Sequence, residues 1–263
     1  MKNISKFLLS AVVLSAVAFT PKTIFAADDP IEYHSHGQVE FTPSTDPTDP
    51  TDPIEPGNPV QPIDPTDPTN PVDPGTPGPL SIDFASSFDF GKQAISSSDK
   101  VYTAAAQAYY KLGADGKPTG DLVYGPDYVQ VTDNRGTLAG WTLTVTQDGQ
   151  FISDSKHVLD GAVVTLKDGN VVTASSSDNK PTPAKDTALT PGTASLVMSA
   201  TNGQGGGTFL NDWGTKSELT SEDQPHTNSV TLSVPGRTTK YAETYKTTLT
   251  WNLSDVPGNG TTE

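Results

Sequence analysis

The chain has 263 residues, which is room for one domain of ordinary size with appended segments. Its 16 basic and 31 acidic residues give a net charge of −15, which argues against nucleic acid and anionic membranes as partners because both require a basic surface. There is no cysteine, which excludes disulfides, thiol catalysis and cysteine-ligated metals, and the 23 glycines and 23 prolines indicate strands and turns.

Residues 1–26 have the pattern of a secretory signal peptide. Lys2 and Lys6 precede the apolar run Phe7–Phe19, and small residues at Ala26-Ala27 provide a cleavage site. The apolar run is too short to cross about 30 Å of hydrocarbon. We therefore expect a secreted protein that has no membrane segment after cleavage. Removal of the first 27 residues leaves 13 basic against 31 acidic residues, a net charge of −18.

Residues 27–43 form a short tail that is too small to fold alone. Gln38–Phe41 alternates polar and apolar residues and is a candidate short strand. His34 and His36 resemble part of a metal site, but two ligands without a third are weak evidence, and we predict no metal site.

Residues 44–79 have proline at every third position from Pro47 to Pro77. Polyproline II has three residues per turn, so this period aligns the proline rings along one edge of an extended chain. Seven carboxylates without a basic residue add self-repulsion. At about 3.1 Å per residue the segment would extend roughly 100 Å, so we predict an acidic, stiff spacer.

Residues 80–263 are predicted to form one all-β domain, an antiparallel sandwich or a barrel-like structure. Short strand-like runs alternate with turn signals of Gly, Asn, Asp and Pro, and helix signals are poor. Asp168-Gly169 separates two β-branched runs and predicts a hairpin. The run Val101–Lys111 is expected to be a strand, since a helix over Tyr102–Leu112 would lack a cap. The other runs expected as strands are Leu80–Phe90, Tyr128–Thr132, Trp141–Gln147, Val158–Leu166, Asn170–Ser175, Ser195–Ala200, Ser229–Val234 and Tyr241–Leu253.

Nothing in the sequence indicates catalysis. Most aspartates of the domain lie in turn contexts, where they bond to their own backbone, and its histidines are His157 and His226. A wall hydrolase would need two carboxyl groups held about 5 to 10 Å apart, a geometry that sequence does not reveal. We predict a protein that is not an enzyme, with no catalytic residues and no cofactor.

Two segments of the domain match each other. Each contains Trp-x-Leu within strict polar–apolar alternation: Trp141 and Leu143 in the first, Trp251 and Leu253 in the second. In a strand this alternation places Trp and Leu on one face and the intervening Thr or Asn on the other.

On these two motifs the chain resembles the WxL-domain cell-surface proteins of low-GC Gram-positive bacteria. The Asp/Pro repeat and the signal peptide fit the same architecture. The resemblance implies a protein of the cell surface that attaches non-covalently to the cell wall, through peptidoglycan, by its C-terminal domain, alongside other surface proteins as partners. The other segments that carry the resemblance are Leu80–Phe84, Phe88–Gly91, Leu189–Gly192, Gly203–Gly207 leading to Trp213-Gly214, and Val234–Gly236.

The role of the motif residues is open at this point. A tryptophan on the apolar face of a strand is usually part of the core, with its indole N–H bonded to a neighbour, whereas an exposed ring could stack on sugars. Trp213 follows the glycine-rich segment Gly203–Gly207 and is the better candidate for exposure. The candidate wall-binding residues are therefore Trp141, Leu143, Trp251, Leu253 and Trp213.

An alternative function is that of an adhesin or assembly subunit whose main ligand is another protein. The piece Val39–Phe41 could add a strand to the sheet edge of such a partner. The final residues contain no sortase motif and no apolar tail, so attachment is expected to be non-covalent. A net charge of −18 would not draw the chain to anionic wall polymers, so we expect stacking and hydrogen bonds to dominate.

Overall fold

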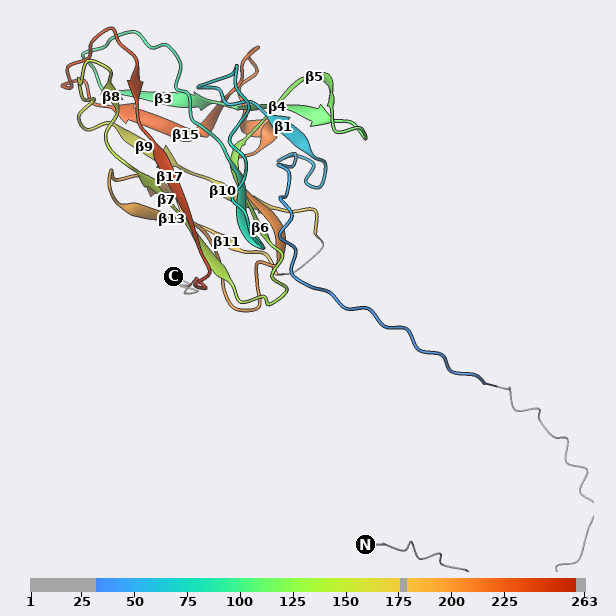
Figure 1. Ribbon diagram of the computed structural model, residues 1–263. Coiled ribbons are helices and arrows are strands. Elements are labelled where there is room, and N and C mark those ends of the chain that lie inside the picture. The colour runs from blue at the N-terminus through green and yellow to red at the C-terminus, as the bar shows by residue number, and fades with distance from the viewer. Residues whose placement is uncertain (1–31, 176–178, 259–263) are drawn as a thin grey trace, which may run out of the picture. The chain divides into compact units, whose positions relative to one another are not determined.

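The computed structural model describes residues 32–175 and 179–258, and the expected signal peptide lies outside these residues. Within them the chain forms 17 strands and a single 3-10 turn at Lys216–Glu218 (Figure 1). All strand pairs are antiparallel, so the all-β prediction is confirmed.

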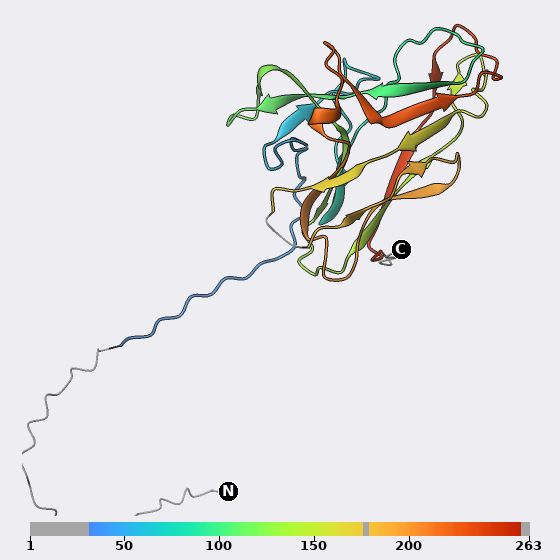
Figure 2. The same cartoon turned by 180° about the vertical axis from the view of Figure 1, so that it is seen from behind.

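Three four-stranded sheets make up most of the domain, and Figures 1 and 2 show them from opposite sides. We name each sheet after a central strand. In spatial order, the β6 sheet contains β10 (Gly169–Val172), β14 (Gly207–Trp213), β6 (Asp127–Asp133) and β2 (Leu80–Ala85). The β15 sheet contains β12 (Thr187–Ala188), β9 (Val163–Leu166), β15 (His226–Val234) and β3 (Lys100–Ala105). The β7 sheet contains β11 (Thr182–Pro183), β13 (Ala194–Ala200), β7 (Trp141–Gln147) and β17 (Leu249–Ser254).

Two smaller sheets complete the fold. One has three strands in the order β1 (Val60–Pro62), β4 (Gln107–Leu112) and β5 (Pro118–Gly125). The other pairs β16 (Tyr245–Lys246) with β8 (Ile152–Ser153).

One hydrophobic core lies among the three large sheets. Val129 of β6, Val230 of β15 and Leu143 of β7 are each fully buried and belong to the same cluster. The alternation on β7 explains how this core forms, because its even-numbered residues are half-buried while its odd-numbered residues are buried. A chain without disulfides obtains its stability from this packing.

Trp141 is the largest side chain in the core that is completely buried. Its indole N–H donates a hydrogen bond of 2.9 Å to the carbonyl oxygen of Gly205. The backbone of Gly205 lies directly on the ring at a φ of +81°, so that a Cβ there would clash with the Trp141 indole and the Ala200 Cβ. Gly205 is therefore required both for its conformation and for its lack of a side chain.

The Asp/Pro-rich segment differs from the expected spacer over part of its length. Residues 49–63 dock on the domain: Val60–Pro62 forms strand β1 on β4, and Asp52 is completely buried. Proline at every third position still leaves two residues in three with an N–H group, and here several of these groups bond to the domain. A period-three pattern predicts local conformation but not whether a binding surface is available.

The predicted hairpin at Asp168-Gly169 is wrong. β9 and β10 flank this dipeptide, but β9 pairs with β12 and β15 whereas β10 pairs with β14. The backbone of Asp168 (φ +53°) turns the chain from one sheet to the other. Its carbonyl accepts from the Gly214 N–H, and its carboxylate accepts from the Ser229 hydroxyl at 3.0 Å. Because neighbouring strands occupy both edges of β9, β10 has no place beside it.

Several other strand predictions need correction. The run Val101–Lys111 is two strands, β3 and β4, in different sheets, and β5 and β14 were missed. The missed β14 begins after the glycine-rich segment and contains Asn211 and Asp212, which are depleted in strands. Gln38–Phe41, a candidate strand, is exposed coil.

Asp127 is buried without a counter-charge. Its side chain is on the face of β6 that carries Val129 and Val131, opposite Trp213 in register. Both carboxyl oxygens are without a hydrogen-bond partner among the described residues. Burial raises the pKa of Asp127 well above its ordinary value of 3.8. Burial, followed by the charge of Asp52, does the same to the pKa of Asp212.

Gly205→Ala should destabilise the domain strongly, because the new methyl group must displace the Trp141 indole. We expect a loss of about 3 kcal/mol in the free energy of unfolding, measured by chemical denaturation. Gly203→Ala is the matched control, since its φ is +90° but no atom lies within 4 Å of the new Cβ. Its free energy of unfolding should fall by only roughly 1 kcal/mol, the cost of placing an alanine in the left-handed conformation. Equal losses in the two variants would contradict the tight contact at Gly205.

Acidification from pH 7 towards pH 4 should stabilise the fold through Asp127. The folded state keeps this proton at pH values where the unfolded chain releases it, so the stabilisation is complete below pH 3.8 and is lost as pH rises through the folded-state pKa. Asp127→Asn should raise the free energy of unfolding at pH 7 by at least about 1 kcal/mol and reduce its pH dependence. Thermal melts across this range measure both quantities. If the Asp127→Asn chain kept the wild-type pH profile, the assignment would be contradicted.

Candidate functional site

The two Trp-x-Leu motifs lie on adjacent strands. β7 and β17 pair antiparallel, with Leu143 opposite Leu253 and Val145 opposite Trp251 (Figure 1). The motifs are more than 100 residues apart in sequence. Their apolar residues therefore form one continuous inner surface of the β7 sheet, and the intervening polar residues form its outer surface.

The first motif belongs to the core. Trp141 and Leu143 are completely buried, and the indole N–H of Trp141 is satisfied by Gly205 as described above. A ring buried in this way has no face free for a ligand. Of the two interpretations left open by the sequence, the core interpretation holds for Trp141.

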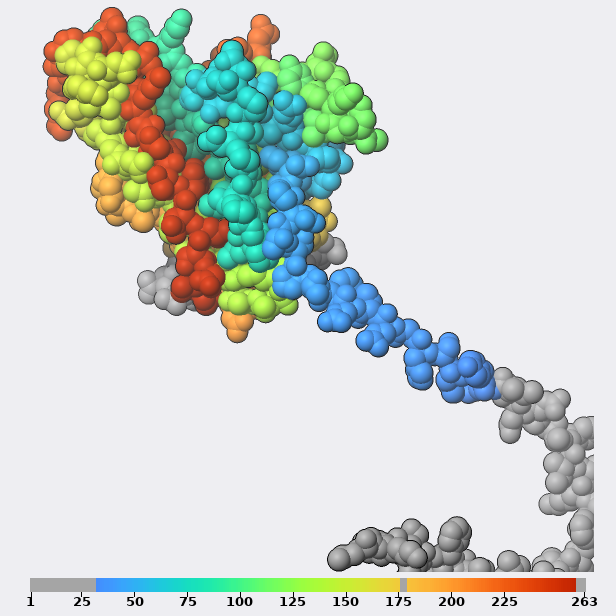
Figure 3. All heavy atoms as spheres, in the orientation of Figure 1, coloured from blue at the N-terminus to red at the C-terminus, as the bar shows by residue number. Residues whose placement is uncertain are grey.

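The second motif lies at the sheet edge. β17 is the last strand of the β7 sheet, and Trp251 and Leu253 are half-buried against the core. In the space-filling view of Figure 3, β17 (red) is part of a band across the surface of the domain. Trp251 is the motif tryptophan whose ring is partly accessible to a ligand.

Trp213 supports Trp251 from within. The two ring centroids are 5.9 Å apart, and Phe88 meets Trp213 edge-on at 5.7 Å. The expectation that Trp213 is exposed is wrong, since only 3% of it is accessible. The preceding glycines do not make this segment loose, because Gly207–Trp213 is the second strand of the β6 sheet.

The outer surface of β7 and β17 is lined by small uncharged polar side chains. Three cross-strand pairs stand in register, and we call these six residues the hydroxyl face: Thr142 and Ser254, Thr144 and Asn252, Thr146 and Thr250. On the far side of β7, β13 adds Ser199 and the 44% exposed Leu196.

Hydrogen bonds hold parts of the hydroxyl face in place. The Thr142 hydroxyl donates to the Val256 carbonyl at 2.9 Å, and the Thr250 hydroxyl donates to an Asp148 carboxylate oxygen at 3.0 Å. Each hydroxyl keeps lone pairs that can accept from a ligand. Apart from the Asp148 carboxylate that Thr250 contacts, this outer surface offers uncharged donors and acceptors, which suit the hydroxyl and amide groups of a neutral glycan better than they suit an ion. The half-buried Trp251 lies on the same edge strand, with its side chain on the inner side of the sheet.

Other chemistry finds little support in the described part of the chain. No group of three or more His, Asp or Glu side chains there is arranged to hold a metal ion. Among the same residues, no helix is long and apolar enough to cross a membrane. His157, one of the two histidines of the domain, stacks on Tyr241 with ring centroids 3.7 Å apart and bonds to Glu243 at 2.9 Å.

Sequence reasoning located the motif strands but missed the surface that they present. The alternating threonines of β7 were visible, and they signalled an outer face. Their alignment with Asn252 and Thr250 depends on a pairing between distant strands, for which a single sequence carries no signal. The docking of residues 49–63 was missed for the same reason.

Comparison with protein families supports the assignment that the motifs suggest. The family model described as WxL domain, surface cell wall-binding, matches residues 28–257. No curated protein and no solved structure matches the chain. The matched range contains both Trp-x-Leu motifs, the hydroxyl face and the docked Asp/Pro-rich segment. On this match, which covers most of its length, the chain belongs to the WxL family of surface proteins that bind the cell wall.

Proposed function

We propose that the chain attaches non-covalently to peptidoglycan through the hydroxyl face, together with the half-buried Trp251 of the edge strand β17. The family assignment supports binding to the cell wall at the cell surface. The observation that carries the finer proposal is the pairing of β7 with β17, which buries the first motif and leaves the hydroxyl face and the half-buried Trp251 at the surface.

The charge of the protein supports the same choice of ligand. With a net charge of −15, the chain gains no general attraction to anionic wall polymers. The six residues of the hydroxyl face are uncharged, so glycan hydroxyls and acetamido groups can bond there without desolvation of an ion. Aromatic edges such as that of Trp251 add contact area to ring C–H groups.

The two motif tryptophans should respond differently to substitution. Trp141→Ala should lower the free energy of unfolding by about 3–5 kcal/mol, since it empties a completely buried site, while Trp251→Ala should lose about 1–2 kcal/mol. Chemical denaturation measures both. Trp141→Phe is the variant that separates stability from binding: if it remains folded, it should bind sacculi as the wild type does. A folded Trp141→Phe variant that fails to bind would contradict a purely structural role for this ring.

Sedimentation with purified peptidoglycan, stripped of teichoic acids, tests the hydroxyl face. Thr144→Arg places a long side chain in the middle of the face and should weaken binding at least ten-fold. The control is Thr165→Arg, because Thr165 is also half-buried on an inner strand, β9, of a different sheet. Circular dichroism shows whether each variant is folded. Equal binding by both variants would place the contact elsewhere, and a folded wild-type chain that stays in solution would exclude intrinsic peptidoglycan binding.

A further inference from the structure

Residues 49–63, which we call the strap, are bound to the domain as a peptide would be. The strap belongs to the proline-triplet segment, yet it covers the outer surface of β6 and adds strand β1 to β4. As a consequence every residue of β6 is buried, on both faces of the sheet. The strap is held through its backbone, the Thr51 hydroxyl, the Asp52 carboxylate and three buried side chains, those of Pro53, Val60 and Pro62.

The strap backbone is recognised by a buried glutamine. Gln130 of β6 is completely buried, and its Oε1 accepts hydrogen bonds from the Thr51 N–H (2.8 Å) and the Thr51 hydroxyl (3.1 Å). Its Nε2 donates to the Asp49 carbonyl at 3.0 Å and to Asp83 at 2.9 Å. The oxygen and the nitrogen of the Gln130 amide therefore both bond to the strap, at Thr51 and at Asp49 respectively.

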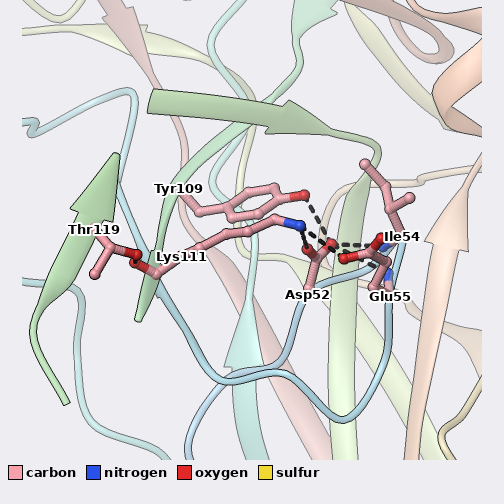
Figure 4. Close-up of polar contacts among 6 residues, drawn as sticks. All are labelled: Asp52, Ile54, Glu55, Tyr109, Lys111 and Thr119. Carbon is pink, nitrogen blue, oxygen red and sulfur yellow. Dashed lines mark hydrogen bonds and ion pairs between the residues drawn. The ribbon is translucent and has the colours of Figure 1, made fainter. Parts of the chain in front are cut away.

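The carboxylate of Asp52 is held by Tyr109 and Lys111 of the domain and by the backbone of the strap itself (Figure 4). Its Oδ1 accepts from the Tyr109 hydroxyl at 2.8 Å and from the Ile54 N–H at 2.8 Å. Its Oδ2 lies 3.3 Å from Nζ of Lys111, which also pairs with Glu55. Asp52 and Tyr109 are completely buried. Burial, together with the hydrogen bond to Asp52, raises the pKa of Tyr109, so this phenol remains a donor.

Pro53, which follows Asp52, packs against Gly125, a residue without a side chain. Pro53 is buried, and a Cβ on Gly125 would lie 2.9 Å from its Cγ. Thr51, Asp52 and Pro53 are thus each recognised by different residues of the domain. The domain therefore contacts the side chains of all three residues, Thr51, Asp52 and Pro53, as well as the backbone of the strap.

The same tripeptide occurs four times in this chain, beginning at Thr45, Thr48, Thr51 and Thr66. Within the described residues only the copy at 51–53 has its aspartate buried, whereas Asp46, Asp49 and Asp67 are exposed. Every copy of the protein therefore carries one occupied pocket and two fully exposed copies of the same tripeptide, which begin at Thr45 and Thr66, while the copy at Thr48 overlaps the strap.

The first part of the link between the strap and β2 lies outside the core, whereas Val72 further along packs against the buried side chains of Phe84, Tyr128 and Leu210. Residues 66–71 are all exposed, and the side-chain hydrogen bonds recorded for them are to each other or to Asp64. Opening residues 66–71 would free the strap while Val72 and the main core stay in place, although the contacts of the buried Val60 with the domain must be broken and made again. Exchange of an identical element between copies is a low-cost route to association, because every native contact is made again.

We propose that the pocket formed by Gln130, Tyr109, Lys111 and Gly125 accepts a Thr-Asp-Pro segment from a second copy of this chain, so that exchanged straps join neighbouring copies. The intramolecular strap has an effective concentration in the millimolar range. Exchange is therefore rare in dilute solution and favoured where copies are crowded on a cell surface. The exposed Thr-Asp-Pro copies of one chain provide additional segments that can bind first to the pocket of a neighbouring chain.

A charge-complementation experiment on full-length chains tests this proposal. Asp52→Asn keeps the shape of the strap but removes its charge, and Lys111→Met removes the cation from the pocket. Each variant alone has an unmatched strap and pocket. In a mixture, the intact strap of the Lys111→Met chain can occupy the intact pocket of the Asp52→Asn chain. We expect at least ten-fold more dimer in the mixture than in either variant alone, measured by light scattering after gel filtration, with circular dichroism as the folding control.

A second experiment avoids any change in the strap or the pocket. A protease site inserted between Thr69 and Asn70 allows the strap to be cut from the folded chain. The cut strap should co-elute with the domain, and a synthetic peptide of residues 43–64 should displace it at least ten-fold more effectively than the same peptide with Asp52→Asn. A cut strap that neither stays bound nor rebinds, equal displacement by the two peptides, or no excess dimer in the mixed variants would overturn the proposal.

Discussion

The packing of Trp141 against Gly205 is the constraint on which the motif sheet depends. An aromatic side chain of this kind buries about 150–250 Å², worth at most about 4–6 kcal/mol. That gain requires the polar N–H to be satisfied inside the core, and the Gly205 carbonyl does this at 2.9 Å. A carbonyl can approach the ring only where residue 205 lacks a Cβ. The motif tryptophan and a glycine 64 residues away therefore form one structural unit.

Burial of the motif explains how a core element can serve a surface function. With Trp141 and Leu143 turned inward, strict alternation turns Thr142, Thr144 and Thr146 outward. β17 pairs in register and continues both surfaces, so packing of the apolar residues on the inner face fixes which polar residues lie on the outer face. Truncation of a core tryptophan, as in Trp141→Ala, would destabilise the sheet and disturb the outer face indirectly, so loss of binding in such a destabilised variant would not by itself identify a contact residue.

Local pattern was sufficient to predict the all-β class, the extent of β7 and the placement of its apolar residues on one face, but it left open whether that face was the core. The same pattern failed wherever the answer depended on a distant partner. Asp168-Gly169 has hairpin composition, but the edges of β9 are already occupied by β12 and β15. Trp213 follows flexible glycines, yet β14 inserts between β6 and β10 and carries the ring into the core. Only part of the hydroxyl face could be predicted from the sequence. The alternating threonines of β7 indicate an outer face, but their pairing with β17 has no signal in a single sequence.

The strap shows most clearly that local sequence pattern does not predict contacts with distant residues, because identical tripeptides have different environments in one chain. Thr45-Asp46-Pro47 is exposed, whereas Thr51-Asp52-Pro53 is bound by Gln130, Tyr109 and Lys111. The difference cannot come from intrinsic propensity, since the residues are the same. It comes from position: the copy at 51–53 is followed by a turn and by β1, whose pairing with β4 holds it over the pocket. The segment that occupies the pocket is therefore the one that is held close to it. A neighbouring copy of the chain that is close enough also brings its Thr-Asp-Pro segments near the pocket.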